Sequence, residues 1–388
     1  MSTNTTPTTT AAAAPPVEPA QPAQPVPTAP AAPLAPAAST RGRTIRRVLV
    51  VALPIVLVVA VFGFAFPQLA SYSSVLDTLG KMSAPWIAVV TATALLNLLA
   101  NWFLISTAIP GLSLPRAGAA NLASTAVANT VPGGGALAMG VSWRMLAGWG
   151  VSTADFGVYA VVTGVWSALA KMATPGLAVL VLAFTGQLPT GATQAATLWT
   201  AALVGLGCFI TVALVIRVSL RDENAAVRAG HAIQRAADRL FRIFRRTAPT
   251  SLTGFVVKFR AEASGLLRHR GVRLTLATIV SDLGWWVVLQ SCLLACGVPL
   301  SEVSWSRCFA AFALARLIST IPITPGGLGL VDFGLGLYLS SGLDAATTAQ
   351  VAAAVLLTRA LTYALPIPIG AVTYLGWQLR KPALAAPH

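Results

Sequence analysis

Two runs rich in glycine and proline interrupt otherwise apolar segments of this chain of 388 residues, at positions 129–135 and 322–329. Glycine lets the backbone approach a ligand closely, and successive backbone N–H groups form a concavity that binds anions. A helix that begins after each run would point its positive end at the same ligand. The runs therefore predict a site for a ligand that carries phosphate, unless they only turn the chain and allow close helix packing. The candidate substrate-binding residues of the two runs are Asn129, Pro132, Gly133, Gly134, Pro325, Gly326, Gly327 and Gly329.

Charged residues within apolar segments are a second signal of a site. They are Asp282, Arg316, Asp332 and Arg359. A charge at the centre of a bilayer costs about 3 kcal/mol or more, so it normally pairs with another charge or lines a pathway. We take these four as candidate substrate-binding residues, together with Arg144 after the first glycine run. The alternative for Asp332 and Arg359 is a structural ion pair that ties a helical hairpin to its neighbour. Arg144 and Lys171 are the candidate counterparts in the first half of the chain, unless they reach the membrane interface.

The composition indicates which elements must position these residues. Hydrophobic residues make up 56% of the chain and charged residues 10%, whereas a water-soluble domain carries about 25% charged residues. The formal net charge of +15 would suggest nucleic acid binding in a soluble protein. Because the apolar segments are long enough to span lipid, the positive-inside rule explains the charge instead, and we expect no nucleic acid partner. The sequence predicts an all-α polytopic membrane protein.

The chain divides into a Pro/Ala/Thr-rich tail at residues 1–40, which is predicted to be disordered, a membrane domain at 41–381, and a short tail at 382–388. Apolar runs predict six membrane crossings, at residues 48–66, 86–108, 156–184, 194–216, 274–296 and 345–379. The glycine runs break two further segments, at 117–148 and 305–340. Pro132 aligns with Pro325 at the same offset as Pro175 with Pro368, which favours a repeat built around a binding site.

The distribution of charge predicts the topology. Residues 217–273 hold 13 Arg and Lys residues against four acids, so we place this basic loop in the cytoplasm. This placement requires the two broken segments to be re-entrant hairpins that begin at opposite faces of the membrane. The expected fold is six crossings plus two re-entrant broken-helix hairpins, an inverted repeat with both termini in the cytoplasm. Residues 227–246 predict an amphipathic helix that binds anionic lipid headgroups or serves only as a topology anchor.

The second glycine run carries a family resemblance. Residues 323–332, with Arg359-Ala360-Leu361-Thr362-Tyr363 about one helix later, resemble the transmembrane flippase-like domain of lysylphosphatidylglycerol synthases. The first run, with Arg144 behind it, is similar to the other signature loop of that family, and the resemblance covers residues 45–380. The chain departs from the family pattern in having Asp332 where Glu is usual, and Ala136-Leu137-Ala138 where an acid often follows the first run. No synthetase domain follows the last apolar segment, so the resemblance implies translocation of a lipid without its synthesis.

We therefore expect a lipid translocator in the cytoplasmic membrane of a bacterium, and not an enzyme. Its substrate would be a phosphate-bearing lipid, such as an aminoacyl-phospholipid or a polyprenyl-phosphate-linked sugar. A membrane-embedded lipid-phosphate transferase and an accessory subunit of an envelope-lipid enzyme are the alternatives. A transferase would need paired acids to hold Mg²⁺, and the predicted spans contain no such pair. We expect no cofactor and no metal, and the sequence leaves the oligomeric state open.

Overall fold

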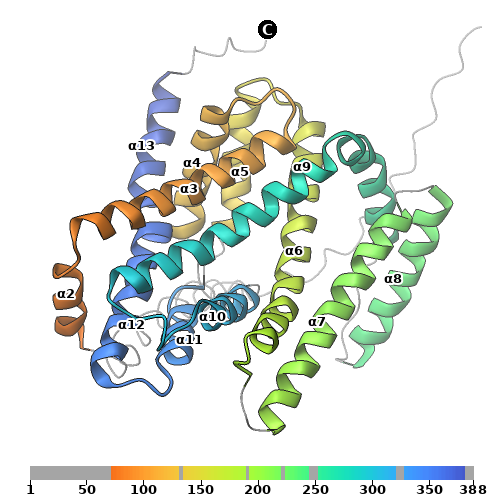
Figure 1. The fold of residues 1–388 in the computed structure, drawn as a ribbon. Coiled ribbons are helices and arrows are strands. Elements are labelled where there is room, and N and C mark those ends of the chain that lie inside the picture. Colours follow the sequence, from red (N-terminus) through yellow and green to blue (C-terminus); the bar gives the residue numbers. More distant parts are fainter. Residues whose placement is uncertain are drawn as a thin grey trace, which may run out of the picture. The chain divides into compact units, whose positions relative to one another are not determined.

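The computed structural model describes residues 71–130, 134–188, 192–219, 223–243, 252–319 and 327–380. Every regular element in these ranges is a helix (Figure 1). The expected crossing at 48–66 and the two tails, at 1–40 and 382–388, lie outside the described residues.

Within the described ranges, five helical segments are long and apolar enough to cross a membrane. They are α3 (Ala84–Ala108), α6 (Thr153–Phe184), Leu198–Val218 of α7 (Ala192–Ser219), Ala263–Ala295 of α9 (Leu252–Ala295), and the composite segment Ala345–Leu379. The composite segment consists of α12 (Ala345–Arg359), the π-helical turn η4 (Ala360–Ala364) and α13 (Pro366–Leu379). The chain is thus an all-α multi-pass membrane protein, and these five segments coincide with five of the six predicted crossings.

Helix starts in the bundle follow ordinary capping chemistry. Ser152 accepts a hydrogen bond from the backbone N–H of Asp155 at 3.1 Å and begins α6. Asp344 accepts one from the N–H of Thr347 at 2.7 Å and begins α12. That N–H holds the pKa of the exposed Asp344 below its ordinary value. These caps satisfy backbone donors that have no partner inside the helix.

The basic segment at 217–273 is more helical than predicted. The expected amphipathic helix at 227–246 is present as α8, which begins earlier and runs over Glu223–Ile243. Helix α9 begins at Leu252, well before the predicted crossing at 274, and packs against α8. The one proline of this segment, Pro249, precedes α9, so no proline interrupts the helix from Leu252 onward, and a continued helix satisfies the backbone N–H and C=O groups of each added residue.

Each of the two broken segments forms a pair of short helices. Helices α4 (Leu114–Thr130) and α5 (Gly134–Ala147) lie side by side, and α10 (Trp305–Ile318) packs against α11 (Leu330–Ser340). The longest of the four, α4, has 17 residues, whereas a transmembrane helix needs about 20 predominantly apolar residues. Both breaks lie where the glycine runs predict them.

The packing of the two halves is reciprocal. Helices α3 and α9 lie side by side through the middle of the bundle (Figure 1). The last helix of the second half, α13, packs on α4 of the first hairpin, and α6 of the first half packs on α10 of the second hairpin. The short helix α2 (Tyr72–Gly80) packs on α12. Each short-helix pair is therefore contacted by a helix from the opposite half.

Candidate functional site

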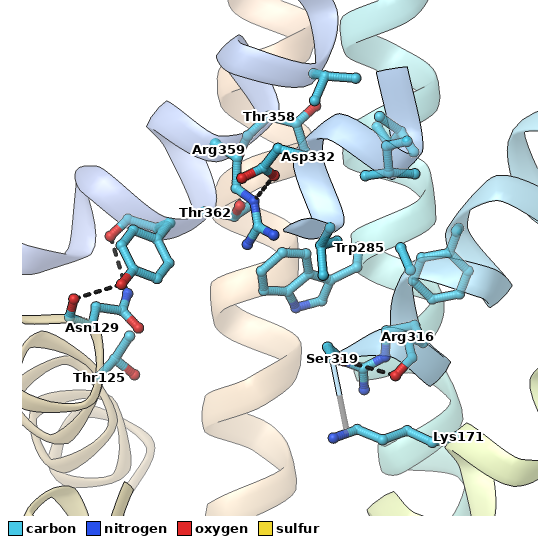
Figure 2. A pocket seen from close by; sticks show the side chains of 17 residues that line it. Thr125, Asn129, Lys171, Trp285, Arg316, Ser319, Asp332, Thr358, Arg359 and Thr362 are labelled. Atoms are coloured by element: carbon cyan, nitrogen blue, oxygen red, sulfur yellow. Dashed lines mark hydrogen bonds and ion pairs between the residues drawn. The ribbon is translucent and has the colours of Figure 1, made fainter. Parts of the chain in front are cut away.

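Side chains from both short-helix pairs line one cavity of about 290 Å³ inside the bundle. Helix α4 contributes Thr125 and Asn129, and α6 contributes Lys171. The remaining lining residues come from α9, from α10 and its C-cap, and from α11, α12 and η4. The polar residues among them are Trp285, Arg316, Ser319, Asp332, Thr358, Arg359, Thr362 and Tyr363. Figure 2 shows the indole of Trp285 between the Asp332–Arg359 pair on one side and Arg316, Ser319 and Lys171 on the other.

Asp332 has two roles at the wall of this cavity. Its carboxylate is fully buried, and one oxygen, Oδ1, accepts a hydrogen bond from Nε of Arg359. The other oxygen, Oδ2, accepts the backbone N–H of Gly329 at 3.0 Å, which caps the start of α11. Gly329 has a φ of 83°, a conformation that residues with a side chain rarely adopt. The glycine run therefore positions the carboxylate, and the carboxylate positions Arg359.

A second ion pair joins α9 to α10. Arg316 donates to Oδ1 of Asp282, and both side chains are mostly buried. The other carboxylate oxygen, Oδ2 of Asp282, is buried and has no hydrogen-bond partner among the described residues. Lys171 lies close enough for both groups to act on it electrostatically. No hydrogen bond or ion pair joins Lys171 to another residue in the part of the chain that the structure describes.

The cavity and its paired acids carry an excess of positive charge. Three cations line it, Lys171, Arg316 and Arg359, against Asp332 in the lining and Asp282 behind Arg316. An uncompensated charge away from water interacts strongly with a charge of opposite sign, because the effective dielectric constant there is low. The arrangement is thus suited to hold an anion.

Asn129 and Tyr363 connect the first short-helix pair to the π-helical turn. Nδ2 of Asn129 donates to the backbone oxygen of Tyr363 at 3.1 Å, and the Tyr363 hydroxyl donates to the backbone oxygen of Asn129 at 2.5 Å (Figure 2). π-helical turns are rare and occur frequently at functional sites. This one directly follows Arg359, so a reciprocal pair of hydrogen bonds supports the turn beside the charged wall.

The structure brings together four of the residues selected from the sequence, because Asn129, Arg316, Asp332 and Arg359 all line the cavity. Gly329 and Asp282 contact lining residues. Arg144 is exposed on α5 and does not line the cavity. The other candidates Pro132, Gly133, Pro325 and Gly326 lie outside the described residues.

Gly134 and Gly327 are the remaining described glycines selected from the sequence. Their surroundings test whether glycine is needed there only for close helix packing. A Cβ on Gly134 would lie 2.6 Å from the backbone oxygen of Val127, so this glycine allows α4 and α5 to approach each other. Gly327 has a φ of 74°, and a Cβ there would lie 2.6 Å from Cγ2 of Val331. At these two positions the geometry accounts for glycine by packing and backbone conformation.

Sequence reasoning did not select several residues of the lining. Lys171 was only a candidate counterpart cation, yet it is the residue that contributes the excess charge. Thr358 and Thr362 are four residues apart and share a helical face, which is a signal that the sequence contained. Trp285 belongs to a Trp-Trp pair, and nothing in the sequence distinguishes which of the two lines the cavity. In the described ranges, no group of three or more His, Cys, Asp or Glu side chains is placed to hold a metal ion.

Comparison with known families identifies the chain. The sequence profile of the family described as the lysylphosphatidylglycerol synthase TM region matches residues 49–370. The chain belongs to this family. The match confirms the resemblance inferred from the second glycine run, and it establishes a membrane protein of a family involved in lipid handling. No individually curated protein matches the chain at a significant level.

Proposed function

We propose that this member of the lysylphosphatidylglycerol synthase TM family translocates a phosphate-bearing lipid across the cytoplasmic membrane of a bacterium. An aminoacyl-phospholipid and a polyprenyl-phosphate-linked sugar are the substrates considered. The observation that carries the proposal is the cavity with excess positive charge, lined from both short-helix pairs of a membrane-spanning bundle. In membranes, broken helices normally line a substrate or ion site.

In this proposal, Lys171 and Arg316 hold the phosphate, and Arg359 approaches it from the other side of Trp285. Hydrogen bonds between a cation and a phosphate are among the strongest in proteins. The protein binds the headgroup, shields it from the hydrocarbon core and releases it at the other face. No covalent step is involved, so the protein acts as a carrier and not as an enzyme.

The proposed topology has six crossings and two re-entrant hairpins that begin at opposite faces, with both termini in the cytoplasm. Three observations support it. The four short helices are too short to cross singly, the packing of the two halves is reciprocal, and the segment at 217–273 is strongly basic. Irregular backbone at membrane depth is tolerated where protein or a wet cavity covers it.

Cysteine labelling tests this topology. In a background with the exposed Cys208 replaced by alanine, we expect Ser113→Cys and Thr153→Cys, on either side of the first hairpin, to react only from the cytoplasm. Ser301→Cys and Ala345→Cys, on either side of the second hairpin, should react only from outside. All four positions are exposed. Labelling of the first two positions from opposite faces would mean that residues 114–147 cross the membrane.

Replacing Lys171 tests whether the cavity binds the phosphate of a translocated lipid. We expect Lys171→Gln to lower the initial rate of translocation about tenfold, since a hydrogen bond to a charged group contributes about 1.5–3 kcal/mol. The measurement is headgroup accessibility of labelled lipids of each class in proteoliposomes containing the full chain. Lys81→Gln is the matched control, because Lys81 is exposed and lies away from the cavity. Wild-type rates for Lys171→Gln with every lipid class would exclude this cavity as the phosphate site.

A further inference from the structure

A second cavity, of about 390 Å³, lies among α6, α7, α9 and α10. Most of its lining is hydrocarbon, from residues such as Leu169, Ala173, Leu177, Phe209 and Ile279. Its polar lining groups include three threonines, whose hydroxyls donate to carbonyl oxygens of their own helices at 2.6–2.9 Å: Thr174, Thr275 and Thr278. The indole N–H of Trp166 donates to Thr275 at 2.8 Å. These groups are satisfied within the protein, so the cavity suits an occupant without polar groups.

This apolar cavity adjoins the charged one along α6, α9 and α10. The ring of Phe312 lines both cavities. Asp282 lines the apolar cavity, while its ion-pair partner Arg316 lines the charged cavity. On α6, Ala170 and Ala173 face the apolar cavity, and Lys171 faces the charged one. The Asp282–Arg316 pair therefore lies at the boundary between the two.

The apolar cavity is also open to the surroundings of the bundle. Leu177, Ile279 and Leu283 line it and remain 47%, 45% and 36% exposed. All three lie on segments that are apolar enough to cross the membrane, so their exposed faces contact lipid chains. A hydrocarbon chain can enter from the bilayer without passing through water.

We propose that one hydrocarbon chain of the translocated lipid occupies this apolar cavity while its phosphate lies in the charged cavity against Lys171. The inference rests on the proposed function and adds a subsite to it. The lipid spans the boundary at Phe312 and the Asp282–Arg316 pair. There the buried Oδ2 of Asp282, for which the described part of the chain offers no hydrogen-bond partner, accepts a hydrogen bond from a hydroxyl or ammonium group of the headgroup.

Photo-crosslinking tests the chain subsite independently of transport. The full chain is reconstituted in phosphatidylcholine vesicles that contain phosphatidylglycerol with a diazirine midway along one acyl chain, and adducts are mapped by mass spectrometry. We expect adducts on Phe209 and Ile279, and an at least fivefold loss of them in Ala173→Phe, which fills the cavity. Ala213→Phe fills it from α7 and keeps the test valid if the first variant folds poorly. Ala168→Phe is the control, because Ala168 is exposed on the same helix and lies outside the cavity.

The remaining comparisons separate the chain subsite from the proposed function. Lys171→Gln should also lower the cavity adducts, because the phosphate anchors the same lipid. Unchanged adducts in both cavity-filling variants would overturn the chain subsite and leave translocation standing. Adducts that are lost in Ala173→Phe but unchanged in Lys171→Gln would show that different molecules occupy the two cavities, and this too would overturn the inference. The protein could also lose adducts in both Ala173→Phe and Lys171→Gln and yet translocate none of the lipids. This result would support one lipid occupying both cavities and would refute the proposed function.

Discussion

Replacing Asp332 with asparagine is expected to lower the free energy of unfolding by about 3–5 kcal/mol, the cost of removing one partner of a buried ion pair. Asparagine keeps an oxygen that can accept the N–H of Gly329, but it removes the buried negative charge to which Arg359 donates. Each kcal/mol shifts the melting temperature by roughly 2–4 °C in chains of about 150–250 residues, and by less in a longer chain. Thermal unfolding in detergent should therefore show a shift of the order of 5 °C.

Two further variants distinguish the roles of the pair. Asp332→Asn combined with Arg359→Gln removes both charges, and we expect it to recover most of the lost stability but to translocate poorly. Arg359→Lys should fold well and also translocate poorly, since lysine keeps the charge but loses the planar fork that binds phosphate. Near wild-type translocation by the double variant would make Arg359 a structural brace, which is the alternative left open by the sequence.

Adding one methyl group at Gly370 is expected to disrupt the contact between α13 and α4. The Cβ of an alanine there would overlap the backbone oxygen of Leu122 and would lie 2.8 Å from Cβ of Ala126. A backbone atom cannot rotate away, so the two helices must separate, at a cost of about 3 kcal/mol or more, the upper end for overpacking. We expect Gly370→Ala to reduce the yield of monodisperse protein and its melting temperature in detergent.

Gly376 provides the matched control on the same helix. A Cβ at Gly376 has no neighbour within 4 Å, and alanine favours a helix over glycine by up to about 1 kcal/mol. Gly376→Ala should therefore be neutral or slightly stabilising. Equal stability of the two variants would mean that α13 does not pack on α4 as closely as the structure places it.

The sequence by itself determined the class of the protein and the positions of the five described long apolar segments. Long apolar runs have no other stable form in lipid than helices that satisfy their own backbone. The described helices end and begin again around the two runs predicted from the sequence: α4 ends at Thr130 and α5 begins at Gly134, and α10 ends at Ile318 and α11 begins at Leu330. The family followed from the second run, because its residue order is specific, and the profile match confirmed it.

Only the tertiary structure decided which charges meet. Asp282 pairs with Arg316, and Asp332 pairs with Arg359. Nothing local to the sequence selects these partners, since each pair joins different helices and depends on how those helices pack. The same reason explains why Lys171 lines the cavity and Arg144 does not. Both are cations in apolar segments of the first half, but the rotation of each helix about its axis is set by packing against its neighbours and not by its own sequence.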